Sequence, residues 1–146
     1  PHPGAEYLIP FGKARMVKPG SSLTLVTYGA LVQKSLVAAT QLEKRNPGWS
    51  IEVIDLRSLL PYDWEAIAAS VRKTNRVMVV HEDTRSFGFG AEIAARVGDE
   101  LFGELDAPLG RVAAVDTWIA YNPGIEDEIL PQVEDVVREA ERILRY

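Results

Sequence analysis

Cysteine is absent from the sequence, and histidine occurs only twice. Without cysteine, disulfide bonds, thiolate chemistry and cysteine-ligated metal sites are excluded. The two histidines, His2 and His81, lie far apart and show no metal-ligand spacing, so the sequence predicts no metal site. No apolar run approaches the roughly 20 residues needed to cross a membrane, and no signal peptide is visible. These absences predict a cytoplasmic protein that makes no contact with a membrane.

Positive charge is also scarce. The chain has 16 Lys and Arg residues and 21 Asp and Glu residues, which gives a formal net charge of -5. No basic stripe is visible, which argues against nucleic acid as the main partner. With 47% hydrophobic and 25% charged residues, the 146-residue chain has the composition of an ordinary globular domain. The first residue is Pro1 and not Met, so we expect residues 1–146 to be a single domain from a longer chain.

Apolar, β-branched runs alternate with helical patterns along the chain. The predicted strands are residues 11–17, 23–28, 51–56, 77–80 and 111–115. The predicted helices are residues 30–44, 63–74, 91–101 and 131–144, with Asp63 as the N-cap of the second and Pro131 in the first turn of the last. Residues 116–124 are predicted to form an irregular loop. This alternation predicts an α/β fold with a largely parallel sheet, helices on both faces and right-handed crossovers.

One stretch, residues 77–93, joins a buried strand to a glycine-containing loop and a helix. It places His81 beside two carboxylates, Glu82 and Asp83, near the carboxyl end of a strand, where open α/β sheets bind ligands. Histidine titrates near neutrality, and a neighbouring carboxylate raises its pKa and orients it, which makes His81 the catalytic candidate. Successive strand residues point to opposite faces, so a contact between His81 and a neighbouring domain is the alternative interpretation.

Other polar and aromatic residues follow the remaining strands. Tyr28, Asp55 and Asp116 come at predicted carboxyl ends and are expected to meet on one edge of the sheet. Carboxylates in such places also cap the next loop or helix, which is the alternative for Asp55 and Asp116. Trp118 and Tyr121 are expected either to anchor an interface or to fold back as a lid over the sheet edge.

The segment Gly88-Phe89-Gly90 matches only part of the dinucleotide-binding pattern G-x-G-x-x-G. Ile93 occupies the position of the third glycine, and the segment follows a late strand, where that pattern is not expected. We interpret the two glycines as turn residues that supply conformational freedom before a helix. A stand-alone α/β module that binds nucleotides or other proteins without catalysis is the alternative to an enzyme component.

Short motifs follow one another in an order and spacing that are specific together. They are residues 9–14, 26–29, 55–61, 70–74, 81–82, 88–93, 106–108, 111–112, 116–117 and 130–131. On these motifs the chain, from about Tyr7 to Leu144, resembles the C-terminal (transketolase C-terminal-like) domain of the β subunit of the E1 component of 2-oxoacid dehydrogenase complexes. It departs from that pattern at Phe87, where the family usually has glycine, and after Thr117, where a proline-rich run is usual.

The resemblance implies a three-layer α/β/α fold with a mixed, mostly parallel five-stranded sheet of order 1-3-2-4-5, in which strand 1 is antiparallel. It implies an oxidoreductase that uses thiamine diphosphate to decarboxylate a 2-oxoacid and transfers the acyl group to the lipoyl group of E2. Thiamine diphosphate and Mg2+ would be bound mainly outside this domain, so the isolated domain is expected to be inactive. Pyruvate, branched-chain 2-oxoacids and acetoin all stay open as substrates.

The resemblance also implies partners and a location. The partners are the E1 α subunit and a second E1 β subunit, which form a heterotetramer, and the subunit-binding domain of E2. A cytoplasmic location is implied, or the mitochondrial matrix if the source is eukaryotic. The candidates for interface contacts are Tyr28, His81, Glu82, Asp116, Trp118 and Tyr121.

Overall fold

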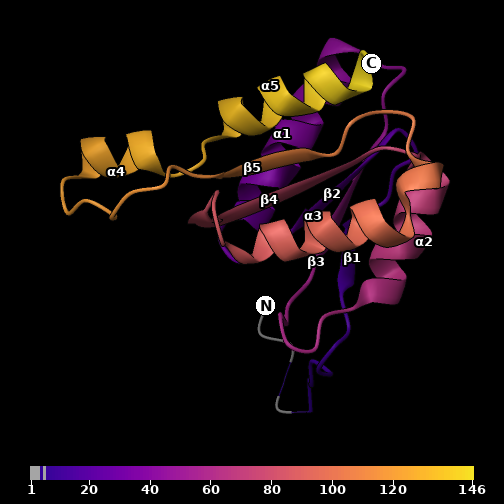
Figure 1. Ribbon diagram of the computed structural model, residues 1–146, viewed down its shortest axis with the longest axis horizontal. Helices are drawn as coiled ribbons and strands as arrows, with labels where there is room; N and C mark the ends of the chain where they lie inside the picture. The colour runs from indigo at the N-terminus through magenta and orange to yellow at the C-terminus, as the bar shows by residue number, and fades with distance from the viewer. Residues whose placement is uncertain (1–3, 5) are drawn as a thin grey trace.

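The computed structural model describes residue 4 and residues 6–146, so His2 lies outside the described residues. Its strands are β1 (Arg15–Lys18), β2 (Leu23–Thr27), β3 (Ile51–Asp55), β4 (Val77–Thr84) and β5 (Gly110–Ala114). They form one five-stranded sheet in the order β1-β3-β2-β4-β5 (Figure 1). β1 pairs with β3 in the antiparallel sense, and all other pairs are parallel. The strand order and the antiparallel first strand are confirmed.

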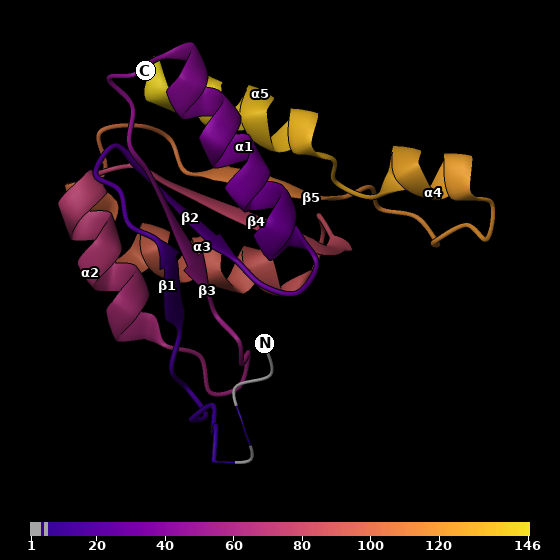
Figure 2. The same ribbon diagram turned by 180° about the vertical axis from the view of Figure 1, so that it is seen from behind.

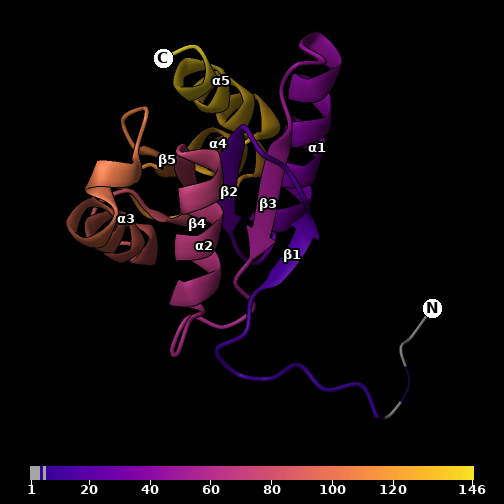
Figure 3. The ribbon, with the colours of Figure 1, turned by 90° about the vertical axis from the view of Figure 1, so that its right-hand side faces the viewer.

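Helices cover both faces of this sheet and complete a three-layer arrangement (Figure 3). α1 (Leu31–Arg45) and α5 (Val133–Leu144) lie on one face, and α2 (Trp64–Thr74) and α3 (Phe89–Glu100) lie on the other. A short 3-10 turn, η1 (Phe102–Glu104), follows α3, and α4 (Pro123–Ile129) precedes α5. The three-layer α/β/α fold is therefore confirmed. No helix in the described part of the chain has the length and apolar character needed to span a bilayer.

The core consists of two apolar clusters, one on each face of the sheet. Leu25 contributes to the cluster beneath α1 and α5, whereas the next residue, Val26, contributes to the cluster beneath α2 and α3. All five residues of β2 are buried, because this central strand is covered from both sides. The continuous apolar runs of the sequence therefore reflect strands buried on two faces, as predicted.

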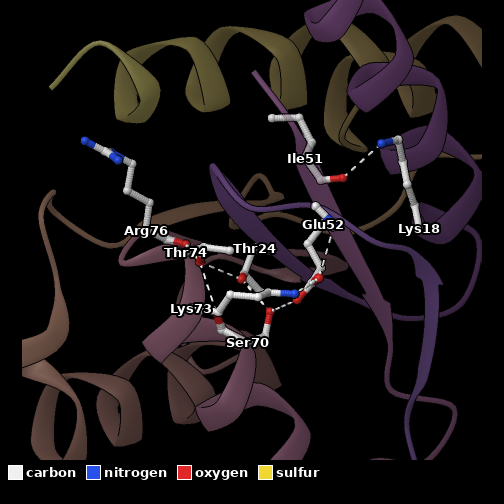
Figure 4. A network of polar contacts seen from close by, with 9 residues as sticks. Lys18, Thr24, Ile51, Glu52, Ser70, Lys73, Thr74 and Arg76 are labelled. Atoms are coloured by element: carbon white, nitrogen blue, oxygen red, sulfur yellow. Dashed lines mark hydrogen bonds and ion pairs between the residues drawn. The ribbon is translucent and has the colours of Figure 1, made fainter. Parts of the chain in front are cut away.

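A buried polar network joins β3 to α2 (Figure 4). The carboxylate of Glu52, which is fully buried, accepts hydrogen bonds from the Ser70 hydroxyl and from the ammonium group of Lys73. The Ser70 hydroxyl also lies 2.6 Å from the hydroxyl of Thr24 in β2, and Thr74 lies 2.8 Å from the same Thr24 atom. These contacts fix α2 across two strands of the sheet, since a buried carboxylate needs its charge and hydrogen-bonding capacity matched.

Helix starts follow the sequence signals in one case and depart from them in another. Asp63 is the N-cap of α2, and its side chain accepts a hydrogen bond from the Ala66 amide at 3.3 Å, as predicted. The prediction that Pro131 lies in the first turn of the last helix is wrong. Gln132 is the N-cap of α5, and its amide donates to the Asp135 carboxylate at 2.9 Å, so the helix begins two residues after the proline.

Three other boundaries differ from the prediction. The first strand covers Arg15–Lys18, so residues 11–14 of the predicted strand lie outside the sheet. β4 extends to Thr84, which places His81 inside the strand. The predicted loop 116–124 runs into α4, where the Asn122 side chain caps the amides of Gly124 and Ile125 at 3.0 and 3.3 Å. α4 has no buried residue and projects away from the three layers (Figure 2).

Candidate functional site

The carboxyl ends of β2, β3, β4 and β5 share one edge of the sheet, because these four strands are parallel. The chain order reverses between β2 and β4: β2 leads through α1 to β3 on one side, whereas β4 leads through α3 to β5 on the other. Such a switch point forms the crevice in which open α/β sheets bind ligands or partners. Here it brings together Tyr28 and His81, whose rings are stacked with centroids 6.1 Å apart and planes 14° apart.

His81 is buried at this switch point. Its side chain is fully buried, and neither ring nitrogen has a hydrogen-bond partner among the described residues. Burial lowers the pKa of His81, and although Asp83 acts to raise it, Arg111 adds to the lowering. Asp83 thus acts on the pKa of His81 in the expected direction, but the net shift is downward because loss of solvation outweighs the nearby charge. The ring is therefore neutral near pH 7.

Gly88 precedes α3 and Gly90 lies in its first turn. Both positions need glycine because neighbouring atoms lie too close for a side chain. A Cβ atom at Gly90 would lie 2.1 Å from Nε2 and 2.2 Å from Cδ2 of His81. A Cβ atom at Gly88 would lie 2.2 Å from the carbonyl oxygen of Thr84, and the φ of Gly88 is an ordinary -62°. The interpretation that these glycines supply conformational freedom is therefore wrong. They let α3 begin directly against the His81 ring and the end of β4.

The two carboxylates after His81 point elsewhere. Both Glu82 and Asp83 are exposed. Asp83 accepts hydrogen bonds from the amides of Thr84 at 2.8 Å and Phe89 at 3.3 Å, so it holds the turn that leads into α3. The Glu82 side chain makes no hydrogen bond or ion pair within the described residues, so its charge is unpaired at the sheet edge.

Tyr28 lies half-buried at the end of β2, and its phenol is protonated at neutral pH. Burial raises the pKa of Tyr28 to about 12, and the negative charges of Asp83 and Glu82 act in the same direction. Its hydroxyl group is therefore available as a hydrogen-bond donor. The combination of a neutral imidazole and a protonated phenol can orient a partner group through hydrogen bonds.

A row of aromatic rings continues from Tyr28 over the α2 and α3 face. Phe89 lies edge-on to Tyr28 with centroids 6.3 Å apart, and Tyr62 lies edge-on to Phe89 at 5.5 Å. Trp64 follows at 6.4 Å, with the Arg96 guanidinium 4.2 Å above its ring. Sequence inspection missed this row, because its members belong to different elements. Their spacing along the chain shows no pattern that a reader of the sequence could use.

The acidic residues at the other strand ends serve local structure. The Asp116 carboxylate accepts hydrogen bonds from the Ser86 amide at 2.8 Å and the Ser86 hydroxyl at 2.6 Å. These hydrogen bonds lower the pKa of Asp116, and the bond from the Ser86 hydroxyl has the larger effect. Asp55 accepts a hydrogen bond from the Arg57 amide at 3.1 Å. Both carboxylates therefore cap the loops that follow or adjoin their strands, which agrees with the alternative stated for them.

The aromatic residues of the 116–124 segment do not cover the sheet edge. The side chain of Trp118 is 92% exposed and that of Tyr121 is fully exposed, so the lid interpretation is wrong in this structure. Ile119 and Ile125 nearby are also more than half exposed. The segment carries an apolar surface that its own domain leaves uncovered, and the role of Trp118 and Tyr121 as interface anchors stays a prediction.

A groove of about 540 Å³ runs beside the edge strand β5, between that strand and the start of α5. At one end of this groove Arg85 and Arg111 each donate a hydrogen bond to the backbone carbonyl of the other, at 3.0 and 2.9 Å. Asp135 and Glu139 of α5 line the opposite side. No sequence pattern indicated the groove. It depends on the pairing of β5 with β4 and on the path of the 128–131 linker.

Comparisons with known proteins converge on one family. The model of the family described as "Transketolase, C-terminal domain" matches residues 12–136. The pyruvate dehydrogenase E1 component subunit beta of Staphylococcus epidermidis (strain ATCC 12228) is 44% identical over 144 residues, which cover 99% of this chain and 43% of that protein. The subunit of the same name from Staphylococcus aureus (strain N315) is 43% identical over the same lengths. The chain thus spans less than half the length of these curated relatives.

Solved structures agree. A protein described as "Split gene transketolase, inactive beta4 tetramer" superposes with a TM-score of 0.82 and 26% identity, over 97% of this chain and 45% of that one. A transketolase from Pichia stipitis superposes with a TM-score of 0.61 over 92% of this chain and 18% of its own, and at 15% identity it shows the fold alone.

Proposed function

This chain belongs to the family of transketolase C-terminal domains, and on that premise we propose that it forms the C-terminal domain of the β subunit of a 2-oxoacid dehydrogenase E1 component. The observation that carries the proposal is the 44% identity over 144 residues to a pyruvate dehydrogenase E1 β subunit. The whole enzyme would decarboxylate a 2-oxoacid oxidatively and transfer the acyl group to the lipoyl group of E2. Among the substrates left open by the sequence, pyruvate is favoured by the names of these relatives.

Within such an enzyme, we propose that this domain contributes to assembly and holds neither the cofactor nor its metal. His81 is buried and neutral, and the carboxylates of Asp55, Asp83 and Asp116 are engaged in loop structure. No three His, Asp or Glu side chains gather into a metal-binding group within the described part of the chain. These residues do not fit the diphosphate and Mg2+ of thiamine diphosphate, so we place both in other parts of the enzyme. The cofactor supplies the carbanion chemistry there.

The partner contacts are proposed for the carboxyl edge of the sheet. Tyr28 offers a phenol donor, Glu82 a free carboxylate, and Trp118 and Tyr121 exposed aromatic surface. Exposed aromatic residues contribute strongly to interfaces when a partner covers them. His81 and Asp116 would act behind this surface, His81 by supporting the Tyr28 ring and Asp116 by holding the turn after β4. The E1 α subunit and a second β subunit are the proposed partners at this edge.

The acidic character of the chain supports a further contact, with E2. The net charge of -5 favours a basic binding segment, because complementary charge speeds association and selects partners. Binding of an E2 subunit-binding domain should therefore weaken as salt is added, which a titration at two ionic strengths measures.

A domain exchange tests the proposed function. In the Staphylococcus epidermidis pyruvate dehydrogenase E1 β subunit, this chain replaces the 144-residue segment that it matches. The hybrid is co-expressed with the α subunit of that enzyme, and its molar mass is measured by size-exclusion chromatography with light scattering. We expect an assembled complex of α and β chains, because the exchanged domain keeps the fold and the edge that partners contact.

Two matched hybrids give the controls. A hybrid with Trp118→Ala and Tyr121→Ala should assemble more weakly, whereas Lys44→Ala, on the far end of α1, should assemble like the parent hybrid. A folded parent hybrid that stays apart from the α subunit would contradict the assignment to E1 β.

A further inference from the structure

The His81 ring lies between the end of β2 and the start of α3. Tyr28 stacks on the ring with centroids 6.1 Å apart. The backbone of α3 contacts the edge of the ring, since a Cβ atom at Gly88 would lie 3.0 Å from Cε1 and one at Gly90 would lie 2.1 Å from Nε2. The first turn of α3 therefore forms part of the cover over this ring.

This cover suits the neutral ring and not the charged one. The side chain of His81 is fully buried, and neither ring nitrogen has a hydrogen-bond partner among the described residues. A neutral imidazole leaves one N–H group unsatisfied in this place, whereas an imidazolium leaves two N–H groups and a full positive charge unsatisfied. The start of a helix carries partial positive charge, so the position of α3 adds to the cost of protonation.

The charges around the ring do not remove this cost. Burial is the largest influence on the pKa of His81 and lowers it, Asp83 acts against burial, and Arg111 acts with it. Tyr28 is uncharged at neutral pH, because burial raises its pKa to about 12. The titratable and charged groups on the elements around the ring are Glu82 and Asp83 on β4, Tyr28 after β2, Arg85 in the turn, Glu92 on α3 and Arg111 on β5.

The turn that leads into α3 is fixed at one end and strained at the other. The Ser86 amide and hydroxyl bind the Asp116 carboxylate, and these bonds lower the pKa of Asp116, so it stays ionised in mild acid. The next residue, Phe87, has a φ of +63°, which residues with a side chain rarely adopt, and its side chain is fully exposed. Because relaxation of such strain favours movement, Ser86 is the fixed end and Phe87 the hinge for the first turn of α3.

We propose that His81 is an acid-sensitive conformational switch: protonation of its ring detaches the first turn of α3 from β4 while the rest of the domain stays folded. In the detached state both N–H groups of the imidazolium reach water, and the backbone of Phe87 relaxes. Local opening costs less than global unfolding, because it gives up the contacts of a single helical turn. The switch acts within this chain and does not depend on the proposed function.

Hydrogen exchange of single backbone amides, followed by NMR from pH 7 to pH 5 and corrected for intrinsic exchange rates, tests the switch. The Ala91 amide, which donates to the Gly88 carbonyl at 2.8 Å, reports on the first turn of α3. Uptake of one proton on opening lowers its protection factor by at most about tenfold per pH unit below about 6.5, so we expect a fall of roughly tenfold to thirtyfold by pH 5. The Ser86 amide, and the Leu101 amide at the far end of α3, should keep their protection.

Three substitutions assign the effect to the His81 ring. His81→Asn removes the titrating group and should make the Ala91 protection factor independent of pH. His2→Asn is the matched control, because His2 is the only other histidine of the sequence, and it should behave like the parent chain. Arg111→Gln removes a positive charge that opposes protonation of the buried ring, so the fall in Ala91 protection should become smaller. If His81→Asn does not fold, Arg111→Gln decides in its place.

Three results would overturn the inference. The first is an Ala91 protection factor that stays constant between pH 7 and pH 5 in the parent chain. The second is an equal loss of protection at Ala91, Ser86 and Leu101, because protonation would then be coupled to unfolding of the whole domain. The third is a fall at Ala91 that persists in His81→Asn or that Arg111→Gln leaves unchanged, because another group would then cause the response to acid.

Discussion

Gly90→Ala probes the close contact between α3 and the His81 ring at the switch point. The added methyl group would lie 2.1 Å from Nε2 of His81, far inside the contact distance of these atoms. The His81 ring is fully buried and stacked on Tyr28, so it cannot turn toward solvent without disturbing this packing. Overpacking of this kind costs about 1–3 kcal/mol. The helical preference of alanine over glycine offsets about 0.5–1 kcal/mol of this cost, so the expected net loss is at most about 2.5 kcal/mol.

The cause of this loss can be isolated with a second substitution. In a His81→Ala background the clash is absent, so Gly90→Ala should become stabilising by about 0.5–1 kcal/mol. Gly98→Ala, in the same helix with no atom within 4 Å of the added Cβ, should stabilise the parent chain by a similar amount. Urea unfolding followed by circular dichroism measures the free energy of unfolding of the parent, the three single variants and the double variant. If Gly90→Ala stabilised the parent chain as Gly98→Ala does, the account of His81 as a closely packed ring would be refuted.

Three further predictions concern charge. Because burial lowers the pKa of His81, the unfolded chain binds a proton at higher pH than the folded chain. The free energy of unfolding should therefore fall as the pH drops below about 6.5. His81→Asn should flatten this pH dependence, which urea titrations at several pH values measure. Lys73→Met leaves the buried Glu52 carboxylate without its cation, so the free energy of unfolding should drop by about 3 kcal/mol. Adding Glu52→Gln to the Lys73→Met chain should recover part of this loss. No drop would mean that solvent compensates the Glu52 charge. Asp116→Ala removes the acceptor of the Ser86 amide, so that amide should exchange its hydrogen faster while global stability changes little; unchanged exchange would contradict the role of Asp116 in holding the turn.

The sequence predicted the layers of this fold well, for a physical reason. Strands covered on both faces, such as residues 23–27, must be apolar throughout, and this pattern is visible without a structure. Asp63 likewise marks the start of α2, because its carboxylate accepts a hydrogen bond from the amide of Ala66, three residues later in the chain. The order of the strands and the antiparallel first strand came from the resemblance to a family, because local patterns do not encode which strands pair.

The candidate site was less visible in the sequence. His81 was identified, but its burial and its lowered pKa depend on Gly90, which reaches it only because α3 folds back onto β4. α4 was missed because it buries no residue and so has no apolar periodicity, although Asn122 and Pro123 carry a helix-start signal. The strain at Phe87 depends on a backbone angle that residue type does not reveal.

The central claim, that this chain is the C-terminal domain of an E1 β subunit, is tested most directly by pyruvate decarboxylation. The measurement is release of CO2 from pyruvate, with thiamine diphosphate, Mg2+ and an artificial electron acceptor, by the Staphylococcus epidermidis E1 whose β subunit contains this chain. The account predicts turnover by the assembled hybrid and none by the isolated 146-residue chain. An assembled hybrid without activity, or CO2 release by the isolated chain, would contradict it.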